Sequence, residues 1–448
     1  MRGKTILQIV HENTSTLDTT LPLLWGVKKK YGQDTNVIIL YLKLNKDQIL
    51  RDGVFINQLC REQNIVQYDL TDFINSHFNF LIRIIRRISR FSYYDYIPRK
   101  EILNFKIITV LENILSVLPS MRRKIDNQIV RLLINNKKIL KYIDPDLVLW
   151  DHRGRVEYTK ADQLYRFFEE KQIPVIMLPH APHEVTPSPN FIKFGNSERI
   201  FPEYCRYWVA FKHLKPWIKE RQRQKDFIYF GYPGLDDEWI RYTNRKINKS
   251  ARVNDVINVL IPLRMFAQRG IDDDKNEKFL YTYKQTRDFL GKVSKILNDI
   301  GTRYHIILKP HPKTNRFLIG QITEEISLLN YTISYDLFSI LLPQSDLCVT
   351  SFSTSIIQVM MYKVQTIVID SEAQSYVQKW EILDSIYRNS GIVIDEEELS
   401  DLICSMISGR HEVESTIFLR EHWPDNAIKK GCEKLSLLLS DKEIPKYF

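Results

Sequence analysis

Two apolar segments in the second half of the chain end abruptly in residues that can hold an anion. Residues 306–308 lead into Lys309-Pro310-His311-Pro312, and residues 347–349 lead into Thr350-Ser351-Phe352-Ser353-Thr354-Ser355. Amino, imidazole and hydroxyl groups at strand ends and helix starts are donors that suit phosphate oxygens. The loops that follow parallel strands lie together at the carboxyl edge of the sheet. The two segments therefore predict a phosphate site and a nucleotide-linked substrate.

The histidine of the first segment has little conformational freedom. Prolines on both sides cannot continue a sheet ladder, so His311 should project from the strand end and donate to a leaving phosphate. Lys309 would add a point charge, and the two would stabilise negative charge on the leaving nucleotide without a metal ion. The alternative is an ordinary histidine in a turn.

The hydroxyl residues of the second segment, Ser351, Ser353, Thr354 and Ser355, would lie at the amino terminus of a helix. Free backbone N–H groups and small hydroxyls bind phosphate oxygens there, although serine also caps helices that bind nothing. Their place between the histidine segment and the next predicted strand favours binding. Arg264, directly after another strand, is either a bidentate phosphate clamp or a plain surface arginine.

A carboxylate ends a strand in the first half of the chain. Asp151 follows the apolar residues 147–150, which places it at a strand end facing the predicted cleft. A carboxylate at such a strand end can act as a general base toward a hydroxyl group, or as a nucleophile that forms a covalent adduct. Asp151 suits either role, and Arg153 beside it is an acceptor-side candidate. The alternative is a strand-end aspartate paired with a neighbouring arginine.

Two histidines follow the next predicted strand in a loop stiffened by two prolines. In Pro179-His180-Ala181-Pro182-His183, His180 is a candidate general base and His183 an acceptor-side contact. A zinc pair with Glu184 would have an unusual spacing, and a purely structural loop is the other alternative. After the first predicted strand, His11 and Asn13 are candidates for acceptor contacts or for capping a helix.

The chain offers no obvious metal site. Asp272-Asp273-Asp274 lies in a charged loop beside a glycine and is best explained as a solvated turn. No Asp-x-Asp pair stands at a strand end. The sequence therefore predicts catalysis without a metal and without a cofactor, the activated donor being a substrate.

Short apolar segments alternate with helical ones in both halves of the chain, as in a doubly wound parallel sheet. The strands predicted in the first half are 5–10, 36–42, 65–68, 147–150 and 175–178. Those of the second half are 257–263, 304–309, 331–334, 346–350, 365–370 and 391–394, with helices at 277–300 and 355–362.

A chain of 448 residues is long enough for two domains. We expect a first domain over 1–240 with an all-helical insertion at about 72–142, and a polar linker over 241–256 that has no periodic apolar face. The second domain, 257–448, ends in a helix at about 425–439 that could cross back to brace the first. Two α/β domains facing each other across a cleft are predicted.

The net charge of +10 could serve nucleic acid, an anionic membrane or a phosphorylated substrate. No nucleic-acid recognition module is present, so nucleic acid is not expected as a partner. Residues 78–100 predict a basic amphipathic helix that lies on an anionic membrane or packs on the protein's own core. No apolar segment reaches the roughly 20 residues of a membrane span. Five scattered cysteines suit a reducing cytoplasm. The membrane alternative for residues 78–100 would place the protein at the inner face of the cytoplasmic membrane.

Several motifs, in order over most of the chain, resemble those of bacterial GT-B transferases that build surface polysaccharide. They are Leu178-Pro179-His180-Ala181-Pro182-His183, Phe230-Gly231-Tyr232-Pro233-Gly234-Leu235-Asp236, Val259-Leu260-Ile261-Pro262-Leu263-Arg264, the Lys309-Pro310-His311-Pro312 motif and the serine-rich motif 351–355. The chain is most similar to CDP-glycerol glycerophosphotransferase-like enzymes and to Kdo and sialic-acid transferases. The resemblance implies two Rossmann-like domains, with the nucleotide on the second and the acceptor on the first.

The function expected from this resemblance is a glycosyltransferase of capsule, lipopolysaccharide or teichoic-type synthesis. It would move a sugar from a nucleotide-activated donor, CMP-linked and of the Kdo or sialic-acid type, to a glycan or lipid-linked acceptor. The alternatives are a CDP-glycerol-type polyol phosphotransferase, an enzyme like UDP-N-acetylglucosamine 2-epimerase, and a non-catalytic membrane-associated scaffold.

Overall fold

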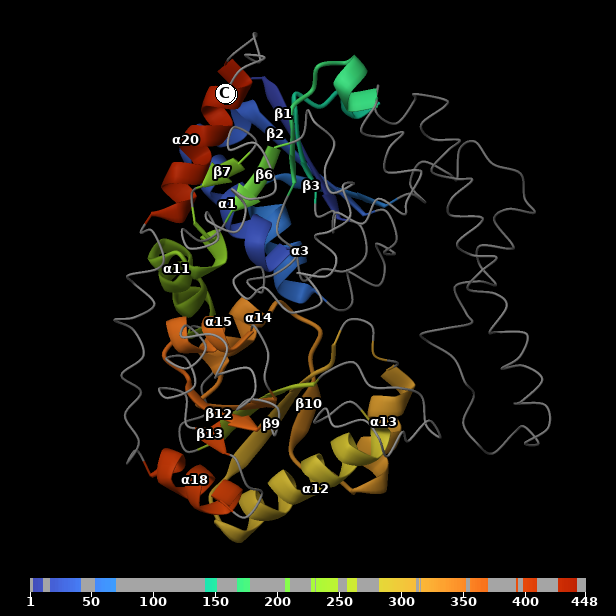
Figure 1. Ribbon diagram of the computed structural model, residues 1–448, viewed down its shortest axis with the longest axis vertical. Coiled ribbons are helices and arrows are strands. Elements are labelled where there is room, and N and C mark those ends of the chain that lie inside the picture. Colours follow the sequence, from blue (N-terminus) through green and yellow to red (C-terminus); the bar gives the residue numbers. More distant parts are fainter. Residues whose placement is uncertain are drawn as a thin grey trace, which may run out of the picture.

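The computed structural model describes a little under half of the chain and builds it into two α/β domains (Figure 1). The described residues are 3–10, 17–41, 53–69, 142–150, 167–177, 206–209, 227–229, 231–248, 256–263, 282–311, 314, 316–351, 355–369, 392–393, 398–408 and 426–440. The predicted helical insertion at 72–142 lies almost entirely outside these ranges, and the predicted basic helix at 78–100 lies wholly outside them.

The first domain contains a seven-stranded sheet, parallel throughout, in the order β3-β2-β1-β4-β5-β6-β7. Its strands are β1 (Lys4–Val10), β2 (Thr35–Tyr41), β3 (Ile65–Asp69), β4 (Leu147–Trp150), β5 (Val175–Met177), β6 (Arg206–Val209) and β7 (Phe227–Tyr229). The first five match the apolar segments in the sequence, whereas β6 and β7 were not predicted.

The second domain contains a six-stranded parallel sheet in the order β10-β9-β8-β11-β12-β13. Its strands are β8 (Ile257–Pro262), β9 (Tyr304–Lys309), β10 (Tyr331–Ile333), β11 (Leu347–Ser351), β12 (Gln365–Ile369) and β13 (Ile392–Val393). Each lies where the sequence predicted a strand, to within two residues at either end.

The two sheets share one topology, because both follow the Rossmann order 3-2-1-4-5-6 and the first adds β7 at its edge. In both sheets an aspartate just before the fourth strand forms a hydrogen bond with the first strand. Asp146 accepts a hydrogen bond from the Thr5 N–H at 2.8 Å, and Asp346 accepts one from the Asn258 N–H at 2.9 Å. Each carboxylate thus ties the start of the fourth strand to the first strand at the amino edge of its sheet. The architecture of two doubly wound α/β domains that the sequence predicted is confirmed.

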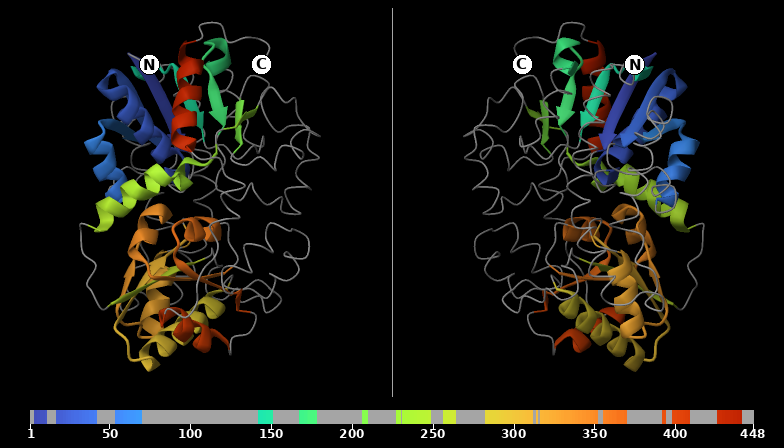
Figure 2. Two further views of the ribbon diagram at one scale, coloured as in Figure 1. Left: turned by 90° about the vertical axis from the view of Figure 1, so that its left-hand side faces the viewer. Right: turned by 90° about the vertical axis from the view of Figure 1, so that its right-hand side faces the viewer.

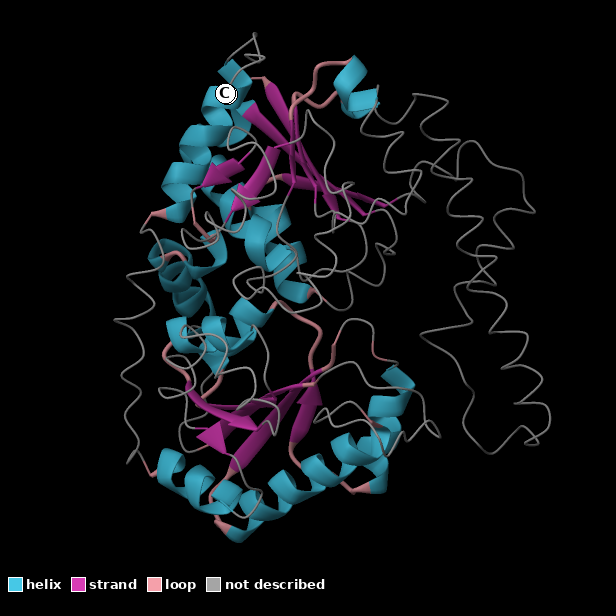
Figure 3. Ribbon diagram, viewed as in Figure 1, coloured by secondary structure: helices cyan, strands magenta, loops and turns pink. Residues whose placement is uncertain are grey.

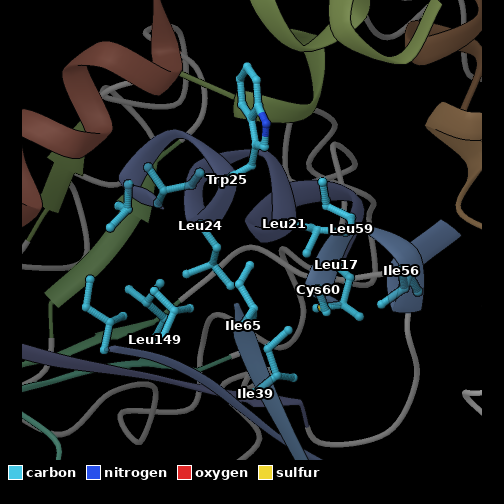
Figure 4. Close-up of a cluster of buried hydrophobic side chains, with 14 of the residues drawn as sticks. Leu17, Leu21, Leu24, Trp25, Ile39, Ile56, Leu59, Cys60, Ile65 and Leu149 are labelled. Carbon is cyan, nitrogen blue, oxygen red and sulfur yellow. The ribbon is translucent and has the colours of Figure 1, made fainter. Parts of the chain in front are cut away.

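One face of the first sheet is covered by helices whose apolar side chains meet it directly. They are α1 (Leu17–Tyr31), followed by the short 3-10 helix η2 (Gly32–Asp34), and α3 (Val54–Glu62). Leu21 and Leu24 point from α1 toward the strands, where Ile39 and Leu149 meet them, and Trp25 points to the opposite side (Figure 4). Alternate residues of β1, β2 and β4 therefore form a continuous buried core with α1 and α3, which Ile65 of β3 and Ile176 of β5 join.

Helices cover both faces of the second sheet, as Figure 3 shows. Val259 and Ile261 face α12 (Tyr283–Asp299), α13 (Arg316–Glu325) and α18 (Glu398–Ile407). Leu260 between them faces the side of α14 (Phe338–Leu341), the 3-10 helix η6 (Leu342–Gln344) and α15 (Ser355–Met361). The α14 side also touches the first domain, because Leu337 and Ile340 belong to that domain's core cluster.

The predicted linker is wrong in its first half, because residues 237–248 form helix α11 (Asp237–Asn248). Trp239 is fully buried and stacks on Tyr242, and both contact Trp25 of α1. Lys246 bonds Glu62 of α3 at 2.8 Å. The apolar residues of α11 are few but fall on one side at helical spacing, so the segment packs despite its charge. Residues 249–255 of the predicted linker lie outside the described part.

The last helix, α20 (Ala427–Ser440), returns to the first domain and lies beside α1 in every view (Figures 1 and 2). Ile428, Cys432 and Leu435 join the core of the first domain. The approach is close at Gly26, where an added Cβ would lie 2.2 Å from Cγ2 of Ile428. None of the helices in the described part of the chain has the length and hydropathy that a membrane crossing requires.

We predict that Gly26→Ala lowers the free energy of unfolding by about 1–3 kcal/mol, because the methyl group forces α20 away from α1. The matched control is Gly320→Ala in α13, where an added Cβ meets nothing within 4 Å. That control should be neutral or stabilising by up to about 1 kcal/mol, because alanine favours a helix over glycine. Urea unfolding followed by circular dichroism measures both, and equal stabilities would contradict the close packing.

Candidate functional site

The carboxyl-terminal ends of the two sheets face each other. Asp18 lies in the first turn of α1, after the carboxyl end of β1, and contacts the start of α14, which follows the carboxyl end of β10. In doubly wound folds ligands bind outside these strand ends, at the point where the strand order reverses. The reversal lies between β1 and β4 in one domain and between β8 and β11 in the other.

The carboxylate of Asp18 is 6% exposed and sits at the domain junction. One oxygen accepts the N–H of Ser339 at 3.2 Å and its hydroxyl at 2.7 Å, and the other accepts the N–H of Phe338 at 3.1 Å. Asp18 therefore caps the amino terminus of α14 from the opposite domain. Burial raises the pKa of Asp18, while the charge of Lys309 and the bonds from Ser339 and Phe338 oppose that rise.

Lys309 is the last residue of β9, and its side chain is directed to the same junction. Its Nζ donates to the backbone carbonyl of Asp336, and the charges of Asp18 and Asp336 act on it through space. Burial lowers the pKa of Lys309, while the two carboxylates oppose that shift. The structure thus gives Lys309, predicted as a phosphate contact, a partner within its own domain and a counter-charge in the other.

Further polar groups, buried or half-buried, connect this pair to the surrounding helices. Tyr362, directly after α15, shares a hydrogen bond of 3.4 Å with the hydroxyl of Thr243 on α11 and also bonds Ser339. Thr19, next to Asp18, donates to the hydroxyl of Tyr232 at 2.7 Å. We call Asp18, Lys309, Ser339, Tyr362 and Thr243 the Asp18 network.

The motif at Phe230–Asp236, with the pattern Gly-x-Pro-x-x-Asp from Gly231 onward, forms a turn that supports this network from the first domain. It spans residues 231–236 and includes the 3-10 helix η5 (Pro233–Leu235), and Gly231 has φ = 90°, a conformation that favours glycine. An added Cβ at Gly234 would lie 2.4 Å from the carbonyl oxygen of Asp18. Glycine is therefore needed for the backbone of the turn to reach α1.

Asp236 ends this turn and caps two helices at once. Its 7%-exposed carboxylate accepts the Glu238 N–H of α11 at 2.9 Å and the Ile428 N–H of α20 at 3.0 Å. Burial raises the pKa of Asp236, and the two backbone bonds oppose the rise. The motif that suggested a transferase thus also joins α1, α11 and α20.

Four of the predicted donor-side residues lie within the described part of the chain, all at carboxyl ends of strands of the second sheet. His311, two residues beyond β9, is half-buried, and its carbonyl accepts the N–H of Thr314 at 2.8 Å. Ser351 is the last residue of β11, and Ser355 begins α15 and is half-buried. With Lys309, they share one edge of the sheet, on either side of β8.

The remaining predicted site residues lie outside the described ranges, although the strands that precede them do not. They are His11, Asn13, Asp151, Arg153, His180 and His183 of the first domain, and Arg264, Ser353 and Thr354 of the second. By sequence they follow the carboxyl ends of β1, β4, β5, β8 and β11. Their roles stay predictions.

Sequence reasoning missed Asp18, Ser339 and Tyr362. One signal was available, since Asp18-Thr19-Thr20 interrupts an apolar helix that begins at Leu17, and such polar residues need partners if buried. It could have indicated a buried polar site. It could not have named the partners, which are more than 300 residues away in the case of Asp18 and Ser339.

The chain resembles known proteins in its fold and not in its sequence. No protein-family model matches the chain, and no curated protein is significantly similar to it in sequence. A protein from Listeria monocytogenes assigned as a UDP-N-acetylglucosamine 2-epimerase superposes with a TM-score of 0.54 at 12% identity, over 100% of both chains. A variant of the wall teichoic acid polymerase TagF gives a TM-score of 0.52 at 11% identity, over 98% of this chain and 88% of that one. The chain has a GT-B-like fold.

We predict that Asp236→Asn lowers the free energy of unfolding by about 1–2 kcal/mol, because an amide offers one acceptor oxygen where two N–H groups need one each. Asp237→Asn is the matched control, since Asp237 is exposed on the same helical turn. It should lower stability by no more than about 0.5 kcal/mol, through the helix dipole. Urea unfolding compares them, and an equal loss in both variants would rule out the double cap.

Proposed function

We propose that this protein is a transferase of bacterial surface polysaccharide synthesis that uses a nucleotide-activated donor. The observation that carries this proposal is the placement of His311 and Ser355 beyond β9 and β11, the two strands that flank β8. Groups that suit phosphate oxygens thereby share the carboxyl edge of a doubly wound sheet, at its switch point. The GT-B-like fold is consistent with this chemistry without specifying it.

The donor would bind on the second domain with its phosphate near His311, Lys309 and the serine-rich segment 351–355. These groups would stabilise the negative charge that grows on the leaving nucleotide as the bond to the transferred group breaks. In the first domain Asp151 or His180 would take the proton of the acceptor hydroxyl. No metal ion is required by this scheme.

We propose a CMP-linked sugar as the donor and a glycan or lipid-linked acceptor. The motifs that resemble Kdo and sialic-acid transferases support this choice. A CDP-glycerol-type phosphotransfer is the second candidate, supported by the likeness of the fold to TagF over 98% of the chain. Both candidates use a cytidine nucleotide, so one screen serves them both.

A thermal-shift screen of CMP, CDP, UDP and GDP tests nucleotide binding directly. A ligand that binds the folded state alone stabilises it by about 2.7 kcal/mol at one hundred times its dissociation constant. We expect CMP or CDP to raise the melting temperature most, and His311→Ala to abolish most of the shift. His305→Ala is the control, because His305 lies within β9, the strand that precedes His311, and bonds Thr332 instead.

Transfer and donor hydrolysis with the matching activated donor then test the chemistry. Asp151→Ala and His311→Ala should each reduce turnover by at least about a hundredfold, the usual effect of losing a general base or a charge-stabilising donor. Normal turnover in both variants with a confirmed donor would refute the assignment. Conversion of UDP-N-acetylglucosamine to its 2-epimer would show an epimerase instead, and the absence of any nucleotide shift would favour a non-catalytic scaffold.

A further inference from the structure

The residues predicted to hold the donor are anchored in the opposite domain. Lys309, at the end of β9, is two residues before His311 and has the counter-charge of Asp18 on the first domain. Tyr362 follows α15, the helix that begins at Ser355, and its hydroxyl reaches Thr243 on α11. The segment that carries His311 thus reaches the first domain through Lys309, and the segment that begins at Ser355 reaches it through Tyr362.

Asp18 has the geometry of a fixed anchor. Its two oxygens accept three hydrogen bonds from Phe338 and Ser339, so the carboxylate cannot rotate without breaking several of them. Gly234 packs against its backbone carbonyl from the other side. A charge held this rigidly in a place sheltered from water exerts a strong and directed field on its neighbour Lys309.

Lys309 is held from two directions. The ammonium group of Lys309 donates one hydrogen bond to the backbone carbonyl of Asp336. Asp18 supplies negative charge from the first domain. Lys309 is half-buried, so the carbonyl of Asp336 and the charge of Asp18 replace part of the water around its ammonium group. Asp18 also accepts the N–H of Phe338, two residues after Asp336, and so fixes the backbone segment that accepts the hydrogen bond from Lys309 beside the strand end that precedes His311.

We propose that Asp18 is a positioning residue for nucleotide binding, acting through Lys309 across the domain junction and making no contact with the nucleotide itself. This inference rests on the proposed function, because it assumes that Lys309 and His311 hold the donor phosphate. It assigns to the first domain a part in donor affinity in addition to its part in acceptor binding.

A double-mutant cycle between Asp18→Asn and Lys309→Met tests this inference, with CDP as the probe and calorimetric titration at a temperature where circular dichroism shows every variant to be folded. We expect each single variant to bind CDP about five- to tenfold more weakly, in the range of typical coupling between sites. In the Lys309→Met background, Asp18→Asn should add less than about twofold, because its effect passes through Lys309.

The control is Asp236→Asn, which removes a buried carboxylate of the same domain far from Lys309 in the hydrogen-bond network. It should reduce stability and leave CDP affinity within about twofold of the wild type, since it caps helices only. A merely structural role for Asp18 would give the same pattern as this control. Ser339→Ala serves if Asp18→Asn does not fold, and should weaken CDP binding about two- to threefold through the lost bond to Asp18.

Three results would overturn the inference. They are unchanged CDP affinity in Asp18→Asn, tighter binding in that variant, and an undiminished effect of Asp18→Asn in the Lys309→Met background. If the wild-type protein binds none of CMP, CDP, UDP and GDP, the proposed function fails and this inference fails with it. Normal binding by the wild type together with any of the three results removes this inference alone.

Discussion

The burial of the Asp18 carboxylate decides how the two domains meet. An ionised carboxyl taken out of water costs several kcal/mol unless hydrogen-bond donors and opposite charge replace the water. Asp18 obtains both only where α14 presents its N–H groups and β9 ends at Lys309. The apolar contacts of Leu337 and Ile340 favour burial in general, but the hydrogen bonds require one particular orientation.

The two sheets have the same kind of hydrogen-bonded aspartate at their amino edges, whereas the polar side chains at their carboxyl edges differ. Asp146 and Asp346 bond backbone N–H groups at the amino edges, where they join the strands that follow the crossover. At the carboxyl edges, Asp18 of the first domain bonds Ser339 of the second, while His311 and Ser355 lie beyond the ends of β9 and β11. Structural carboxylates thus hold the amino edges together, whereas the predicted donor-side residues lie at the carboxyl edge of the second sheet.

The strands could be predicted because strands buried on both faces form continuous apolar segments, such as Leu147–Trp150. The short strands β6 and β7 lack that signal, since Arg206 begins one of them and charged residues precede the other. Helix α11 was mistaken for a linker because its charged residues outnumber its apolar ones. The spacing of Trp239, Tyr242 and Ile247 carried the helical signal that composition concealed.

The part of the site that is local in sequence could also be predicted, whereas the contacts between distant residues could not. His311 and the serines of segment 351–355 could be found because each motif is complete within a few residues. The partner of Asp18 could not be found, because Ser339 is separated from it by 321 positions and no pattern along the chain links them. Yet Lys309 and Tyr362 join those local motifs to α1 and α11, so the geometry of the predicted donor segments depends on contacts that only the folded chain creates. The positions of Lys309 and Tyr362 therefore depend on residues of the other domain that neither motif contains.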